Sequence, residues 1–307
     1  MESDKKSDKN IVTSYVRYLK LARNYSPNTV EAYQHDLACL LDYCGKEGKS
    51  PLAMQLEDLE HFSATIHERG VGQVSQARII SGVKSFYRYL VMEGYLEDDP
   101  SELLESPQRG EHLPEVLSTE EVDRLEASID VSKPEGHRNR AIIEVLFSCG
   151  LRVSELVNMK ISNIFRDEMF LRIMGKGSKE RLVPLSPKAL QELDDWFDVR
   201  CNMKIKPGEE DYVFLNRRGA HLTRTMILIM IKRQAIEAGI TKTISPHTLR
   251  HSFATELLKG GADLRFIQAM LGHEDIGTTE IYTHIDVSTL REEILLHHPR
   301  NKHYHGK

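Results

Sequence analysis

The hydrophobic pattern of this chain changes character once, near residue 107. Up to that point apolar residues recur only at intervals of three and four, the spacing of one face of an α-helix. An acidic, turn-rich segment, residues 93–118, then interrupts the pattern. Beyond it, short alternating stretches typical of strands are mixed with further helical stretches. We therefore expect two domains, at residues 1–107 and 114–307, joined by a linker at 108–113.

The first domain is expected to consist of helices. Ser26 and Pro27 are typical of a helix start, because serine caps free backbone N–H groups and proline fits the first turn. A later helix has an apolar side made of Ile79, Ile80, Val83, Phe86, Tyr87 and Leu90. Its other side carries Arg78, Lys84 and Arg88, which suit contacts with a sugar-phosphate backbone. A solvated helix face has the same composition, so the sequence leaves both interpretations open.

The second domain is expected to be mainly α-helical with a small antiparallel β-sheet. Residues 169–174 and 181–185 alternate as strands do, and the glycines between them predict a hairpin. Ser118 to Glu121 has the form of a helix start, and Cys149-Gly150 that of a helix end. The fold class is therefore mainly α with a small antiparallel sheet in the second domain.

Length and composition exclude several classes of protein. With 307 residues, 40% of them hydrophobic, the chain is long enough for two packed cores. Its four cysteines form neither a CxxC pair nor a pattern with histidines, which argues against a zinc site and a disulfide framework. The charged N-terminus lacks a following apolar segment, and no apolar run approaches the ~18 residues that cross a membrane. We expect a cytoplasmic protein without a membrane contact or a bound metal.

The net charge of −5 argues by itself against nucleic acid as a ligand, because phosphates are neutralised by clustered Lys and Arg. The charge is unevenly distributed. Residues 1–107 contain 12 Lys and Arg against 17 Asp and Glu, and the remainder contains 41 − 12 = 29 against 46 − 17 = 29. A surface for DNA must therefore be a local face of the molecule.

Five short segments of the second domain carry residues suited to phosphate chemistry. In order they are GLRVSEL at 150–156, GKG at 175–177, HTLRH at 247–251, LGH at 271–273 and TTEIY at 278–282. Ser245-Pro246 starts a helix that places His247 and Arg250 on one face near its positive end, which suits an anion. Each segment alone is common in unrelated proteins, as a turn, a surface pair or a packed tyrosine, so only their joint order is specific.

That order of Arg, Lys, His-x-x-Arg, Leu-Gly-His and Tyr resembles the tyrosine recombinase (lambda integrase) family. The short length and the helical first domain resemble its Xer subgroup, and the resemblance covers nearly the whole chain. It implies a catalytic set of Arg152, Lys176, His247, Arg250, His273 and the nucleophile Tyr282. It also implies that a core-binding domain and a catalytic domain form a C-shaped clamp on DNA.

The residue types fit these roles. Two guanidiniums, Arg152 and Arg250, remain protonated and can stabilise the charge that grows on a phosphate under attack. A tyrosine with an ordinary pKa of about 10 needs a base or a positive field to attack at neutral pH. By resemblance, His247 is the base. Glu155, one turn after Arg152, is expected to orient an arginine.

Lys176, on a glycine-flanked turn, can donate a proton to the leaving 5′-oxygen. By resemblance, His273 would hydrogen-bond a non-bridging oxygen. A 3′-phosphotyrosine conserves the energy of the broken bond for rejoining, so the scheme requires no cofactor, neither ATP nor metal.

The resemblance implies double-stranded DNA with a specific recombination site as the substrate. It implies a homo- or hetero-tetramer with a related recombinase, a DNA translocase of the FtsK type as a further partner, and the resolution of chromosome dimers at a dif-like site. The alternatives are a mobile-element or phage integrase and a DNA inversion recombinase. More distant ones are a non-catalytic DNA-binding module and a type IB topoisomerase, whose pattern usually has lysine where this chain has His247.

The C-terminal residues also allow two interpretations. Histidines at 297, 298, 303 and 305 suit either a metal tract or a solvated tail, of which the tail is commoner. In Xer-like proteins the segment after the tyrosine resembles an arm that packs into a neighbouring protomer, and Leu290, Ile294, Leu295 and Leu296 supply an apolar stripe for it. We predict that a chain cut after Ser288 loses cooperative assembly on DNA.

Overall fold

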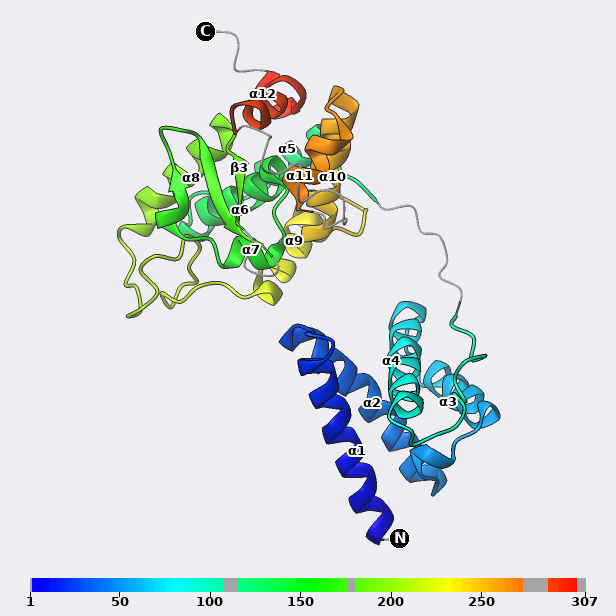
Figure 1. Ribbon diagram of the computed structural model, residues 1–307. Helices are drawn as coiled ribbons and strands as arrows, with labels where there is room; N and C mark the ends of the chain where they lie inside the picture. The colour runs from blue at the N-terminus through cyan, green and yellow to red at the C-terminus, as the bar shows by residue number, and fades with distance from the viewer. Residues whose placement is uncertain (1, 108–114, 176–179, 273–286, 303–307) are drawn as a thin grey trace. The chain divides into compact units, whose positions relative to one another are not determined.

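The computed structural model describes residues 2–107, 115–175, 180–272 and 287–302. The chain divides into two compact units, Met1–His112 and Leu113–Lys307 (Figure 1). Each unit has a hydrophobic core of its own. The linker predicted at 108–113 lies outside the described residues.

The secondary-structure elements in the described part of the N-terminal unit are all helices, as predicted (Figure 1). Its elements are α1 (Glu2–Leu21), α2 (Pro27–Glu47), the 3₁₀ turn η1 (Pro51–Ala53), α3 (Leu56–Glu68) and α4 (Gln73–Met92). The helix start at Ser26 is confirmed, since its side chain accepts a hydrogen bond from the backbone N–H of Thr29 at 3.2 Å. The apolar side predicted for α4 is confirmed as well, because all six of its residues are buried.

Helices α2 and α4 approach each other closely where Gly82 meets Asp36. A Cβ atom at Gly82 would lie 2.7 Å from the Cβ of Asp36, which is too close for any side chain. Asp36 is only 2% exposed, and its carboxylate pairs with Arg78 on α4 at 2.5 Å. The helix pair is therefore held by a small residue on one helix and an ion pair between the two.

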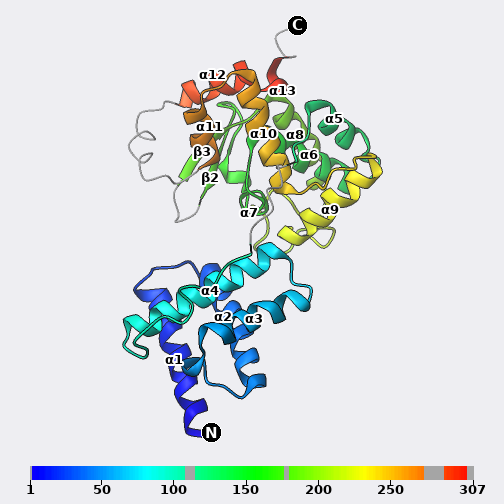
Figure 2. The same cartoon turned by 90° about the vertical axis from the view of Figure 1, so that its right-hand side faces the viewer.

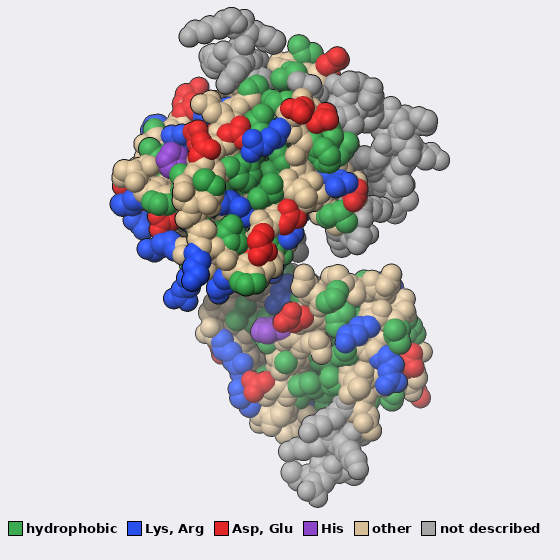
Figure 3. Space-filling model, turned by 90° about the vertical axis from the view of Figure 1, so that its left-hand side faces the viewer, with side chains coloured by type: hydrophobic (Ala, Val, Ile, Leu, Met, Phe, Trp, Pro, Cys, Tyr) green, Lys and Arg blue, Asp and Glu red, His purple; other side chains and the backbone are tan. Residues whose placement is uncertain are grey.

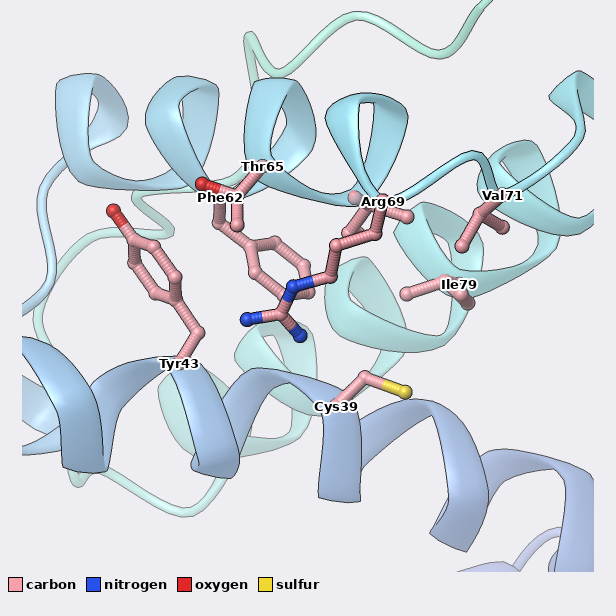
Figure 4. A pocket seen from close by; sticks show the side chains of 8 residues that line it. Cys39, Tyr43, Phe62, Thr65, Arg69, Val71 and Ile79 are labelled. Atoms are coloured by element: carbon pink, nitrogen blue, oxygen red, sulfur yellow. The ribbon is translucent and has the colours of Figure 1, made fainter.

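A small cavity opens between α2 and α3 in this unit (Figure 4). Its walls include Cys39 and Tyr43 of α2 and Phe62 of α3, and the side chain of Arg69 extends toward α2 between Cys39 and Tyr43. The cavity measures about 60 Å³. Typical ligand sites measure roughly 300–1,000 Å³, so this one is a packing gap and not a cofactor site.

The C-terminal unit combines helices with one small sheet, as predicted (Figure 2). Its first elements are α5 (Thr119–Ala127), α6 (Pro134–Cys149), α7 (Val153–Val157), η2 (Ile161–Asn163), β1 (Ile164–Phe165), β2 (Phe170–Met174) and β3 (Glu180–Pro184). These are followed by α8 (Pro187–Arg200), α9 (Arg224–Glu237), α10 (Pro246–Gly260), α11 (Leu264–Leu271), α12 (Val287–His297) and α13 (Pro299–Lys302).

Helix α6 lies at the centre of this unit and packs against both α8 and α10. Every residue from Ala141 to Cys149 is buried, so the helix has no polar face along this stretch. Gly150 ends α6 in the left-handed region, with φ at 60°, which confirms the predicted helix end. The helix start predicted at Ser118 is also confirmed, by reciprocal hydrogen bonds between Ser118 and Glu121.

The sheet is antiparallel with strand order β1-β2-β3. The two predicted strands are β2 and β3, whose register pairs Ile173 with Arg181 and Leu171 with Val183. The sequence did not predict β1, which is only two residues long and pairs through Ile164 and Phe165. The hairpin loop between β2 and β3 lies largely outside the described residues.

The C-terminal segment α12–α13 packs on its own unit, against α10 and β3 (Figure 2). Ile294 is buried here, whereas Leu296 is 63% exposed, so only part of the predicted apolar stripe is buried. His298 and Arg300 are also buried. The segment is therefore anchored as much by polar as by apolar side chains. No helix in the described residues is long and apolar enough to cross a membrane.

Candidate active site

Arg152 is held at the start of α7 by Glu155. The carboxylate of Glu155 accepts a hydrogen bond from the backbone N–H of Arg152 at 2.8 Å and another from its Nη1 at 3.0 Å. A short helix begins here because the Arg152 backbone and Glu155 form this reciprocal cap. The guanidinium of Arg152 thus has a fixed direction while its side chain remains 33% exposed.

Arg250 lies in the second turn of α10 and is only 8% exposed. Its Nη1 donates to the carbonyl oxygen of Gly150 at 2.6 Å, and its Nη2 donates to the carbonyl oxygen of Leu271. Glycine is required at position 150 because a Cβ atom there would lie 2.4 Å from the ring of Phe253. Arg250 therefore ties the end of α6 to the end of α11.

The last carbonyls of α11 bring the two arginines together. Nη2 of Arg152 donates to the carbonyl oxygen of Gly272 at 2.8 Å, and Arg250 donates to that of Leu271, the residue before it. Consecutive Cα atoms are about 3.8 Å apart, so the two guanidiniums lie close together. Both bind the helix end where free carbonyls carry partial negative charge.

A third arginine, Arg181 on β3, joins this cluster and was missed by the sequence analysis. Its Nη1 and Nη2 each donate to the Glu155 carboxylate at 2.7 Å, and its Nε donates to the carbonyl oxygen of Met270 at 3.0 Å. The sequence did contain one indication of it. Arg181 shares a strand face with the buried Val183, and a charged residue on the inward face of a strand needs a partner.

The cluster is positively charged. Three guanidiniums, Arg152, Arg181 and Arg250, against the single carboxylate of Glu155 leave a net charge of +2. Burial raises the pKa of Glu155, but hydrogen bonds and charge from Arg181 and Arg152 outweigh it and hold the pKa below its ordinary value. Burial, then repulsion from Arg152, lowers the pKa of Arg250 to about 10. Arg250 therefore stays charged at neutral pH, and the place suits an anion.

His247 lies in the first turn of α10, the helix that also carries Arg250, and its side chain is exposed. The predicted spacing of these two residues on one face is confirmed by the helix. Lys176, His273 and Tyr282 lie outside the described residues. Lys176 belongs to the connection from β2 to β3, and His273 directly follows Gly272. The structure thus brings Arg152 and Arg250 together, and Glu155 links Arg152 to Arg181.

The three basic residues predicted to bind DNA on α4 differ in their surroundings. Arg78 is paired with the buried Asp36, and Lys84 donates to the carbonyl oxygen of Glu102 at 3.2 Å. Arg88 is exposed. In the view of Figure 3, basic and acidic side chains are interspersed over both units, which agrees with the low net charge. Arg78 thus helps to hold α4 against α2, whether or not it also contacts DNA.

The C-terminal histidines within the described residues have structural partners. His297 Nδ1 lies 2.6 Å from the carbonyl oxygen of Gly260, and the ring of His298 packs against Phe147 and Phe253. His303 and His305 lie outside the described residues. Among the residues that are described, no group of three or more His, Cys, Asp or Glu side chains is arranged to hold a metal ion.

Two family models match the chain. Residues 115–289 match the phage integrase family, and residues 12–94 match the phage integrase N-terminal SAM-like domain. The first match covers the unit that carries the arginine cluster, and the second covers the helical unit.

Curated relatives match over almost their whole length. The chain is 39% identical over 293 residues to tyrosine recombinase XerD of Listeria monocytogenes, covering 94% of this chain and 99% of the relative. It is 38% identical over 291 residues to tyrosine recombinase XerD of Staphylococcus aureus, with the same coverage. Among solved structures, the XerH site-specific recombinase bound to its difH substrate in a pre-cleavage complex is 26% identical, with a TM-score of 0.66 over 92% of this chain and 83% of that one.

Proposed function

The chain belongs to the phage integrase family of tyrosine recombinases and is of the Xer type, and on this basis we propose that it recombines DNA at a specific site through a covalent bond at Tyr282. The proposed role is the resolution of chromosome dimers at a dif-like site. The identity to XerD proteins over nearly the whole chain supports this role over that of a phage or mobile-element integrase.

One observation carries the proposal most directly. Arg152 and Arg250, from segments 98 residues apart, place their guanidiniums on two consecutive carbonyls at the end of α11. Each guanidinium has five N–H donors, so both retain donors for a further acceptor. A phosphodiester offers two non-bridging oxygens, and two neighbouring guanidiniums can bind both. This arrangement favours a phosphate whose charge rises during reaction.

In the proposed reaction, Tyr282 attacks the scissile phosphorus and the bond to the 5′-oxygen breaks. His247 accepts the phenol proton, which raises the nucleophilicity of the tyrosine. Lys176 donates a proton to the departing 5′-oxygen, and His273 hydrogen-bonds a non-bridging oxygen. The products are a 3′-phosphotyrosine and a free 5′-hydroxyl. Reversal with a 5′-hydroxyl from another strand rejoins the DNA, so the scheme needs neither ATP nor a metal cofactor.

The substrate in this proposal is double-stranded DNA with a specific site, by analogy with the XerH relative, a site-specific recombinase whose solved structure holds its difH substrate. Lys84 and Arg88 of α4 would contact the sugar-phosphate backbone. Strand exchange between two sites requires four protomers, so we expect a tetramer with itself or with a related recombinase. A DNA translocase of the FtsK type is the further partner. Because the proposed substrate is chromosomal, we place the enzyme in the cytoplasm.

The test is covalent trapping on a nicked duplex that carries a dif-like site, since loss of the short fragment beyond the nick prevents rejoining. The wild-type chain is expected to form an adduct that survives denaturation, and Tyr282→Phe to form none. Tyr304→Phe, another C-terminal tyrosine, is the matched control and should retain the adduct. An adduct with Tyr282→Phe would refute the nucleophile. Relaxation of a plasmid without any such site would indicate a type IB topoisomerase instead.

A further inference from the structure

Arg181 connects three segments that each lead to a proposed catalytic residue. It lies on β3, five residues after Lys176. Its two terminal nitrogens bind Glu155, which in turn holds Arg152. Its Nε binds the carbonyl oxygen of Met270, three residues before His273. A single side chain thus fixes the hairpin strand, the start of α7 and the end of α11 relative to one another.

The end of α11 is bound by three arginines in sequence. The carbonyl oxygens of Met270, Leu271 and Gly272 accept hydrogen bonds from Arg181, Arg250 and Arg152, respectively. Helix ends leave such carbonyls without intrahelical partners, and guanidiniums supply both donors and opposite charge. The positions of Arg152 and Arg250 therefore depend on where α11 ends, and Arg181 is the residue that fastens this end to the sheet.

Arg181 itself faces away from solvent. Its side chain is 10% exposed, compared with 33% for Arg152. All three of its side-chain nitrogens donate to acceptors within the protein. Glu155 is almost fully buried, and its carboxylate would draw Arg152 inward if no second cation shared it. Arg181 provides that second cation.

We propose that Arg181 is a positioning residue for strand cleavage, which acts by holding Glu155 and the end of α11 so that Arg152 and Arg250 are directed at the scissile phosphate. This inference rests on the proposed function. A guanidinium is required because its planar fork satisfies both Glu155 oxygens and a third acceptor at once, which a lysine ammonium does not.

The experiment compares Arg181→Met and Arg181→Lys with a matched control on the neighbouring strand. Arg172 of β2 is also partly buried and donates two hydrogen bonds, but to Asn163, away from the cluster. Single-turnover formation of the covalent adduct on the nicked duplex should slow on the order of 10- to 100-fold in Arg181→Met, because small displacements of catalytic groups cost rates of this size. Arg172→Met should cleave at the wild-type rate, and DNA affinity should be unchanged in all variants.

The conservative variant distinguishes geometry from charge. Arg181→Lys retains the charge and most of the volume, so a merely electrostatic role predicts full activity, whereas our inference predicts a rate close to that of Arg181→Met. A wild-type rate in Arg181→Lys would overturn the inference. If Arg181→Met does not fold, the cleavage rate of Arg181→Lys is sufficient to test the inference. A loss of DNA affinity as large as the loss of rate would make Arg181 a DNA ligand and would equally overturn it.

A double variant tests the route through Glu155. If Arg181 acts through this carboxylate, Glu155→Gln combined with Arg181→Met should cleave no more slowly than the slower single variant. A double variant whose cleavage rate falls by the product of the two single reductions would contradict the inference.

A readout without DNA keeps this test separate from the proposed function. Hydrogen exchange of residues 152–157 and 270–272 should be faster in Arg181→Met than in Arg172→Met, whether or not the chain cleaves DNA. Unchanged exchange would refute the positioning role, whereas absence of any adduct with the wild-type chain would refute only the function.

Discussion

Nε of Arg300 lies 3.0 Å from the carboxylate of Glu144, a residue with no exposed surface in the centre of α6. Arg300 also pairs with Glu126 at 3.3 Å and with Asp123, both on α5. Lys188 is the second cation of this cluster and lies 2.5 Å from Glu126. Three carboxyl groups of this cluster thus share two cations, of which one is supplied by the C-terminal segment.

Arg300→Met is expected to destabilise the chain strongly. The variant leaves Glu144 and Glu126 buried with Lys188 alone, and removal of one partner from a buried ion pair costs about 3–5 kcal/mol. Arg217→Met is the matched control, because Arg217 pairs with Glu135 at 2.9 Å but its side chain is 85% exposed. Exposed pairs contribute about 0–1 kcal/mol. Urea unfolding of both variants measures the difference, and equal losses would contradict the role of Arg300.

His298 predicts how stability depends on pH. The residue has no exposed surface, and burial together with the charge of Arg300 lowers its pKa from 6.5 to about 3. Between these two values the unfolded chain binds a proton that the folded chain does not. Stability should therefore be complete above pH 6.5 and fall as the pH decreases toward 3, by up to about 1.4 kcal/mol per unit.

His298→Phe retains a ring of similar shape and removes the titrating group. Its unfolding free energy should decrease less than that of the wild-type chain when the pH is lowered from about 7 to about 5. His61→Phe, at an exposed position of α3, is the control and should follow the wild-type profile. If the unfolding free energies of the wild-type chain and of His298→Phe decreased by the same amount, His298 would not be buried in its neutral form.

Gly150→Ala is expected to destabilise the fold for two reasons, of which only one applies to Gly239→Ala. Gly150 and Gly239 both end helices with similar backbone angles, φ 60° and 65°, but only at Gly150 would a Cβ meet a side chain, the ring of Phe253 at 2.4 Å. Gly239→Ala should cost about 1–2 kcal/mol for the left-handed conformation. Gly150→Ala should cost a further 1–3 kcal/mol or so for overpacking.

Only Gly150→Ala should also slow adduct formation, because the Gly150 carbonyl accepts a hydrogen bond from Arg250. Equal unfolding free energies in the two variants, measured in urea, would refute the steric argument. An unchanged cleavage rate in Gly150→Ala would show that Arg250 does not depend on this carbonyl.

On α4, substitution of Arg78 is expected to reduce stability, and substitution of Arg88 is expected to affect DNA binding. Arg78→Met leaves the Asp36 carboxylate, 2% exposed, without its partner and should cost on the order of 1–3 kcal/mol. Arg88→Met removes an exposed charge and should leave the melting temperature unchanged. If Arg88 binds a phosphate, its loss should reduce the slope of log affinity against log salt by about 0.9. An unchanged slope would favour a merely solvated face.

Local patterns were sufficient to predict much of this fold. Helix starts at Ser26 and Ser118 and the end at Gly150 follow from interactions within a few residues, which sequence spacing records directly. The short strand β1 was missed, because two residues are too few to show alternation. Its position is set by pairing with β2, not by its own sequence.

Long-range ion pairs were the part that the sequence did not reveal. Arg181 and Glu155 are 26 residues apart, and Arg300 and Glu144 are 156 apart, so no spacing indicates that they meet. The same is true of Arg78, for which the sequence left a DNA contact and a solvated face open, and whose guanidinium also pairs with Asp36 from another helix. In each case burial creates the need for a partner, and burial depends on the complete fold.

A chain cut after Ser288 should lose both stability and cooperative assembly, and the two losses can be separated. The cut removes the buried Ile294, His298 and Arg300, so its cost should be at least that of Arg300→Met, about 3 kcal/mol or more. A synthetic peptide of residues 289–302 should restore stability, because it supplies the same cation to the same carboxylates.

The peptide should not restore cooperative binding to a duplex with two sites, because it joins no second protomer, whereas affinity for a duplex with one site should be unaffected by the cut. Gel-shift titrations on the two duplexes, below the melting temperature of the cut chain, measure both quantities. If the cut chain still filled both sites cooperatively, the segment would stabilise its own unit and take no part in assembly. If the peptide restored cooperativity, the segment would act by supporting the fold and not by linking protomers.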